Sequence, residues 1–245
     1  MKNLVKAEFR RIRTTRTVPG LLVGMLALIG VAAWGTTAAA DAAALGRPLI
    51  GHEVFLVVLA VLPLFMLIVG IRSITDEFRH GSIVPTLLAA PRRRAVLTAK
   101  LLSVGATAIV FGLAAFTVAA GLTAALVTAE VGAITVGWSQ LGVFAAKLIG
   151  VAALYAAIGV GVGAIIRHQV AAIVGGLIWV LVAENLADGL MPAVAKYLPV
   201  HAANAIVGGM PGVYVDAGIG AALLLGWATL AFAVGAQVMR RRDIA

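Results

Sequence analysis

The sequence predicts an all-α membrane protein with six transmembrane helices, an N-terminal amphipathic interfacial helix and a helical cytoplasmic loop. Two compositional observations predict this class. Hydrophobic residues make up 62% of the 245 residues, and charged residues only 12%. A soluble domain carries about 25% charged residues, so a globule of this composition could not cover its surface with polar groups. The chain therefore requires an apolar solvent.

Six stretches satisfy the length of about 20 mostly apolar residues that a spanning helix needs. They lack the alternation of membrane β-barrel strands and are too long for them. Because backbone polar groups in hydrocarbon must be bonded internally, we expect helices. The stretches are Val18–Ala39, Val54–Ile71, Leu101–Leu122, Leu148–Ile166, Val170–Ala187 and Ala217–Met239.

The first stretch has a second interpretation as a cleaved signal peptide. Basic residues precede it, and Ala38, Ala39 and Ala40 resemble a small-residue cleavage site. The basic segment is long, however, and five more spans follow, so a retained helix is favoured.

The distribution of basic residues predicts the orientation. In a six-span arrangement, 16 of the 19 Lys and Arg residues fall on one side, and only Arg47, Lys147 and Lys196 fall on the other. The positive-inside rule makes the crowded side cytoplasmic, so both termini are expected there, in a cell membrane. The net charge of +9 then indicates topology, and no nucleic-acid partner is expected.

We expect one transmembrane domain over residues 1–245. Its parts outside the spans are an interfacial helix over 1–17, a cytoplasmic loop over 73–91 and an outer connection over 188–216 with short re-entrant or surface helices. Within 1–17, Leu4, Val5, Phe9 and Ile12 fall in one arc of a basic helix, which is typical of helices in the membrane interface. A simple positively charged anchor explains the same pattern.

The loop after the second span combines acidic and apolar side chains. Ser73 followed by Asp76 is a capping-box pattern that predicts a helix start, and Gly81 can end the helix. Such an element serves either to dock a cytoplasmic partner or to lie on lipid headgroups.

Three ionisable residues fall near or within the spans, namely Lys147, Glu184 and Asp188. Glu184 and Asp188 are four apart and share a helix face. Intramembrane charges are often functional, which makes the three candidate path or gate residues. All three also lie within reach of the outer interface, where side chains can snorkel.

Small residues are spaced for close helix packing at Gly20 and Gly24, and again at Gly159, Gly161 and Gly163. Packing within the bundle is favoured over a dedicated dimer seam.

The chain has no cysteine, which excludes thiolate chemistry, and it has no P-loop for ATP. We predict no catalytic, cofactor-binding or metal-binding residue, and therefore no enzyme. An intramembrane enzyme would have only Glu184 and Asp188 as a paired catalytic group, close to the outer edge.

With these features in view, the chain resembles over its whole length the permease subunits of ABC-2 type ABC transporters. Such permeases tend to show a Glu, an aromatic or small residue and a basic residue, then Gly-Ser/Thr-Ile, a Leu pair, Pro-Arg and a Lys that opens the third span. The chain departs from that pattern at Pro85 and Arg94. The matching residues are Glu8, Glu77, Phe78, Arg79, Gly81, Ser82, Ile83, Leu87, Leu88, Pro91, Arg92 and Lys100, with Tyr197, Leu198 and Pro199 before the last span.

The resemblance implies an ABC exporter in which the loop is a coupling helix that docks on a separate cytoplasmic ATPase subunit. ATP and Mg would then be bound by that partner. A second permease copy or paralogue, membrane lipids and a hydrophobic or amphipathic cargo (drug, lipid or peptide) are also implied. A secondary transporter, or a membrane anchor or sensor for a cytoplasmic partner, is the alternative. The predicted docking residues are Asp76, Glu77, Phe78, Arg79, Gly81, Ser82, Ile83 and Leu87.

Overall fold

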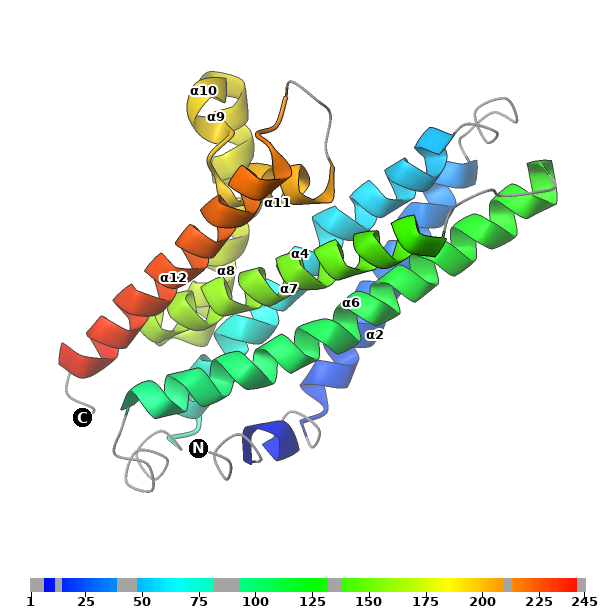
Figure 1. Ribbon diagram of the computed structural model, residues 1–245. Coiled ribbons are helices and arrows are strands. Elements are labelled where there is room, and N and C mark those ends of the chain that lie inside the picture. Colours follow the sequence, from blue (N-terminus) through cyan, green and yellow to red (C-terminus); the bar gives the residue numbers. More distant parts are fainter. Residues whose placement is uncertain are drawn as a thin grey trace.

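Long helices account for nearly all of the described chain (Figure 1). The computed structural model describes residues 7–11, 15–38, 48–81, 93–131, 138–208 and 213–241. Within these ranges there is no β-strand, and six helices are long and apolar enough to cross a membrane. The elements are α2 (Thr17–Ala38), α4 (Pro48–Arg79), α6 (Arg93–Val131), α7 (Trp138–Ile166), α8 (Gln169–Ile178), the π-helix η1 (Trp179–Ala183), α9 (Glu184–Leu190), α10 (Pro192–Ala195), α11 (Pro199–Val207) and α12 (Ala217–Arg241).

The six predicted spans are confirmed, but α4 and α6 extend well beyond the apolar runs. They contain 32 and 39 residues. At 1.5 Å per residue, α6 is about 58 Å long, roughly twice the hydrocarbon thickness of about 30 Å. These two helices therefore project polar turns out of the apolar layer.

The prediction that a new helix starts at Ser73 is wrong. The Ser73 hydroxyl donates to the carbonyl oxygen of Gly70 at 2.7 Å, inside a helix that continues without a break. Asp76 does not complete a capping box, because its carboxylate pairs with Arg72 one turn earlier, at 3.1 Å. The side chains that suggested a cap thus bind other residues of α4 within the continuous helix.

The central helix of the bundle is α7, which packs most extensively on α4, α6 and α12. Small residues allow its backbone to approach theirs. A Cβ atom added at Gly70 of α4 would lie 2.1 Å from a carbonyl oxygen of α7, and one at Gly159 would lie 2.3 Å from a carbonyl oxygen of α4. Gly161 makes a similar approach to α12. The predicted glycine spacing on α7 therefore serves packing within the bundle, whereas a Cβ at Gly20 would meet no described atom within 4 Å.

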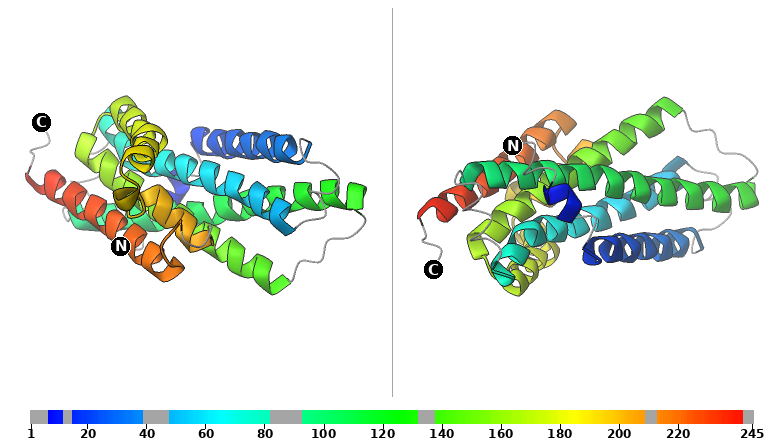
Figure 2. Two further views of the ribbon diagram at one scale, coloured as in Figure 1. Left: turned by 90° about the horizontal axis from the view of Figure 1, so that it is seen from above. Right: turned by 90° about the horizontal axis from the view of Figure 1, so that it is seen from below.

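The helices α2 and α12 pack on two different sides of the central helices. α2 packs on α4 and α6, and α12 packs on α7 and α11 (Figure 2). The start of α2 and the end of α12 lie at the same end of the bundle (Figure 1). We call this the α12-C end; at the opposite end, α10 and α11 connect the fifth span to α12. Ala202, Ala203 and Val207 of α11 are buried, so α11 is packed onto the bundle.

The outside of the bundle is covered with apolar side chains. Val31 on α2 is 67% exposed and Leu190 on α9 is 77% exposed, and the fifth span is mostly uncovered along its length. Water-soluble monomers rarely expose contiguous apolar patches above a few hundred Å². The surface therefore requires lipid or another apolar partner, in agreement with the composition.

Candidate functional site

The predicted docking segment begins within the last turn of α4, which carries Asp76, Glu77, Phe78 and Arg79. Gly81 follows with a φ of 65°, and it ends the helix as predicted. Three further predicted docking residues lie outside the described residues, namely Ser82, Ile83 and Leu87.

Directly behind this turn is a group of charges built around a buried lysine. Lys100 of α6 is fully buried and donates three hydrogen bonds, to Glu77 Oε1 at 2.5 Å, to Glu8 Oε1 at 3.0 Å and to the carbonyl oxygen of Ser73 at 2.8 Å. Since an ammonium group has three N–H donors, all of them are satisfied. Arg11 also donates to Glu77 Oε1. The Lys100 cluster, as we name Glu8, Arg11, Glu77 and Lys100, contains two cations and two carboxylates.

The Lys100 cluster joins three separate parts of the chain. Glu8 and Arg11 are one helical turn apart on the short helical segment 7–11, which lies across the α12-C end of the bundle (Figure 2). Glu77 lies on α4 and Lys100 on α6. Buried charges are tolerated only when paired, so the cluster fixes segment 7–11 against both helices.

Segment 7–11 is the described part of the predicted interfacial helix over 1–17. Phe9 is 39% exposed, as expected for an apolar side chain at a membrane interface. The other members of the predicted apolar arc, Leu4, Val5 and Ile12, lie outside the described residues.

A second ionic contact supports the Lys100 cluster on the side of α2. Arg72 donates to Asp76 at 3.1 Å and to the Thr17 hydroxyl at 3.2 Å. A small cavity of about 40 Å³ separates this contact from segment 7–11, with Glu8 and Arg11 in its wall. The start of α2 is thereby connected to the same end of α4.

The aromatic member of the motif faces the protein. Phe78 is half-buried, and the Arg167 guanidinium carbon lies 5.2 Å from the centre of its ring. Arg167 adopts a positive φ of 60° in the tight turn between α7 and α8, and it donates to the carbonyl oxygen of Val238 on α12 at 3.5 Å. Phe78 and Arg167 therefore link α4 to α12.

The predicted docking residues thus divide by exposure. Arg79 is exposed, with a hydrogen bond to Gln169 at 3.1 Å, and Gly81 is exposed as well. Asp76 is partly buried beside Arg72, and Glu77 is only 2% exposed. In this structure Glu77 binds Lys100 and Arg11, so its carboxylate does not face the surface that a partner would meet.

The second group of predicted residues lies at the opposite end. Glu184 is 1% exposed at the start of α9, and its Oε2 accepts a hydrogen bond from the backbone N–H of Val200 at 2.8 Å. Val200 is in the first turn of α11, where unpaired N–H groups and the helix dipole favour a carboxylate. Asp188 pairs with His201 at 3.1 Å. Both acids therefore contact the first turn of α11 from one face, as their spacing predicts.

Two neighbouring residues complete this region. The Tyr214 ring lies 5.5 Å from the His201 ring, and burial raises the pKa of the Tyr214 hydroxyl, with a further contribution from the Asp188 carboxylate. Lys147 is half-buried on α7, and among the described residues no ion pair joins it to Glu184 or Asp188. The structure therefore brings together two of the three predicted path or gate residues.

Sequence reasoning missed Arg11, Arg167 and His201 as contact residues. For Arg11 a signal was available, because Glu8 and Arg11 have the i,i+3 spacing that puts them on one helix face. Arg167 and His201 carry no such signal, since their partners are 89 and 13 residues away along the chain.

No group of three or more metal-ligating side chains occurs in the part of the chain that the structure describes. Among curated proteins, none matches this sequence. A sequence profile described as ABC-2 family transporter protein matches residues 4–184. The match includes all four residues of the Lys100 cluster and ends at Glu184, before α11 and α12. Because it covers well over half of the chain, this protein belongs to the ABC-2 family of membrane transport proteins.

Proposed function

We propose that this protein is the transmembrane permease subunit of an ATP-driven exporter. Two such chains would form the translocation path, and a separate cytoplasmic subunit would bind ATP and Mg and hydrolyse the nucleotide. Family membership supports the transport role. The single observation that carries the coupling part is the Lys100 cluster, which ties the predicted docking segment to two spans and to segment 7–11.

In this proposal α4 acts as a lever. Its end exposes Arg79, His80 and Gly81, so a partner that moves there pushes on a helix of 32 residues. Lys100 makes α6 follow α4, and Phe78 with Arg167 transmits the displacement to α12. Glu77 is then a positioning residue that holds the lever, while Arg79 makes the direct contact.

The proposed permease role also sets which end of the bundle faces the cytoplasm. The α12-C end carries the Lys100 cluster and the basic ends of α4 and α12, and we place it in the cytoplasm of a cell with both termini. The positive-inside rule supports this placement. The end with α10 and α11 then faces outward.

The apolar character of the spans supports a hydrophobic or amphipathic cargo such as a drug, lipid or peptide. Glu184 is occupied by the first turn of α11, which makes it a structural cap in this proposal. Lys147 remains the candidate path residue within the apolar layer.

Co-purification of the full-length protein with its P-loop ATPase partner tests the proposal. Arg79→Ala should reduce recovery of the complex and the ATP hydrolysis that the permease stimulates in proteoliposomes. Lys196→Ala, which removes one positive charge at the opposite end, is the matched control and should change neither.

Two outcomes would contradict the proposal. If no P-loop ATPase associates and ion-gradient-driven transport occurs in vesicles, the protein is a secondary transporter. If an ATPase binds but its hydrolysis is unaffected by the permease, the protein is an anchor.

A further inference from the structure

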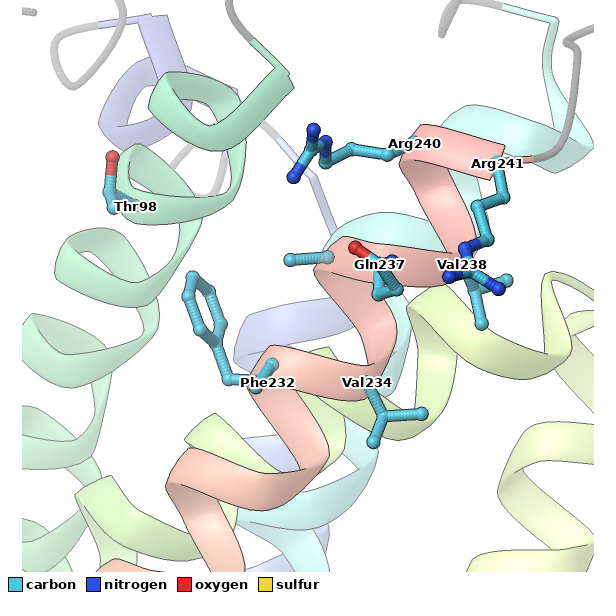
Figure 3. Close-up of a pocket in the computed structure, with 9 residues that line it drawn as sticks. Thr98, Phe232, Val234, Gln237, Val238, Arg240 and Arg241 are labelled. Atoms are coloured by element: carbon cyan, nitrogen blue, oxygen red, sulfur yellow. The ribbon is translucent and has the colours of Figure 1, made fainter.

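A groove lies between α6 and α12 at the α12-C end, and the proposed function does not use it. Its volume is about 790 Å³, within the range of ligand sites for small organic molecules. Its lining is mostly apolar and comes almost entirely from α12 among the described residues. Phe232 extends toward α6, where Thr98 lies, and Val234 and Val238 line the part of the space on the other side of α12 (Figure 3).

An aromatic and a basic side chain lie at different depths in the groove. Phe232 and Arg240 are eight residues apart, which places them on one face of α12 about two turns from each other. Both side chains extend toward α6, where Thr98 faces them (Figure 3). The groove therefore has an aromatic side chain inside and a guanidinium group at its mouth.

The depth of Arg240 matches that of lipid phosphates. The 25 residues of α12 span about 37 Å, while the hydrocarbon core is about 30 Å thick. A residue in the last turn of this span therefore lies at the level of the headgroups, and the Phe232 ring lies among the acyl chains.

The charge of the groove is positive. Arg240 and Arg241 line it, and no acidic side chain does so among the described lining residues. Arg241 lies on the side of α12 that carries Val238, whereas Arg240 extends toward α6 (Figure 3), so Arg240 is the lining cation on the side of Phe232 and Thr98. Guanidinium groups bind phosphate through two parallel hydrogen bonds, and basic pockets between spans on the cytoplasmic side suit anionic headgroups.

We propose that this groove is a binding site for an anionic phospholipid of the leaflet at the α12-C end. The lipid phosphate would bind Arg240, and one acyl chain would lie along Phe232 between α6 and α12. A bound lipid would fill the space between α6 and α12, which contact each other much less than either contacts α7.

The absence of cysteine in the sequence permits a direct test with the full-length protein. A fluorophore is attached to the cysteine of the Thr98→Cys variant, and the protein is placed in nanodiscs. Lipids with brominated acyl chains quench the fluorophore when they lie next to it. Brominated phosphatidylglycerol should quench it at a mole fraction about fivefold lower than brominated phosphatidylcholine, since one cation near the surface contributes roughly that preference. A fluorophore on Leu230→Cys, at an exposed position of α12, should show no preference.

Two variants determine whether Arg240 is responsible. Arg240→Gln should abolish the preference at Thr98→Cys, and Arg240→Lys should retain most of it. Arg10→Gln removes one charge outside the groove and should leave the preference unchanged.

The proposal is overturned if both lipids quench the Thr98→Cys protein with native Arg240 equally, which would mean that only bulk lipid enters the groove. It is also overturned if the preference survives Arg240→Gln. ATP-dependent appearance of the anionic lipid in the opposite leaflet would show that the lipid is cargo, and would likewise contradict a resident lipid.

Discussion

The carboxylates of Glu77 and Glu184 are almost equally buried, at 2% and 1% exposure, but they are stabilised in different ways. Glu77 binds two cations, Lys100 and Arg11, that come from other parts of the chain. Glu184 binds a backbone N–H group at the start of α11 and no cation among the described residues. The buried carboxylate is therefore held by paired charges at one end of the bundle and by a helix N-terminus at the other, where the exposed Asp188 also pairs with His201.

The difference matters because the two arrangements respond differently to displacement. A cap bond is local and fixes α11 on a single neighbour. A cluster of paired charges in an apolar surrounding holds three elements together and becomes costly as soon as one partner leaves. The Lys100 cluster is therefore suited to make α4, α6 and segment 7–11 move as a unit, and the following variants test this contrast.

The largest effect is expected for Lys100→Met. It leaves the buried Glu77 and the partly exposed Glu8 without their ammonium partner, and breaking a buried ion pair costs about 3–5 kcal/mol. Thermal unfolding in detergent should show a clear fall in Tm. Lys147→Met, at a half-buried position, is the matched control with little expected change.

A double variant separates the charge from the volume of Lys100. Lys100→Met with Glu77→Gln restores neutrality and should recover most of the lost Tm, because replacing an entire buried ion pair is often nearly neutral. If the double variant is less stable than Lys100→Met alone, the loss is a packing effect and the charge argument is wrong.

An intermediate effect is expected at the other end. Glu184→Ala removes the acceptor for the Val200 N–H, and loss of a helix cap costs about 1 kcal/mol. Glu184→Gln keeps an acceptor and should cost less. Chemical denaturation in detergent can rank the two, and equal losses would mean that the hydrogen bond to α11 contributes nothing.

A smaller effect is expected for Arg72→Gln. The pair with Asp76 has side chains that are 22% and 15% exposed, and pairs of this i,i+4 kind contribute roughly 0.3–0.5 kcal/mol. Tm should fall slightly, and high salt should reduce the difference from the unmodified protein. A loss as large as that of Lys100→Met would show that Arg72 belongs to the buried network.

The spans could be predicted from the sequence because each is an uninterrupted apolar run, and hydrocarbon leaves the backbone no alternative to a helix. The helix ends could not. The polar residues after Ile71 continue α4, since Arg72 and Asp76 pair across one turn and stabilise the helix outside the apolar layer.

The candidate site was predictable only in part. The motif drew attention to Glu8, Glu77 and Lys100, but their contacts join residues 23 and 92 positions apart, and no local pattern reports that distance. Glu77 was therefore expected to face a partner. Likewise, the spacing of Glu184 and Asp188 predicted a shared face, and only the folded chain shows that α11 is what they contact.

The most direct test of the central claim is ATP hydrolysis by the permease–ATPase complex that contains the Lys100→Met, Glu77→Gln double variant. Its Tm should be close to normal, so any loss of function is not a folding defect. We predict that permease-stimulated hydrolysis falls to the rate of the ATPase subunit alone, because α4 no longer moves α6 through Lys100. Stimulation equal to that of the unmodified complex would contradict the account.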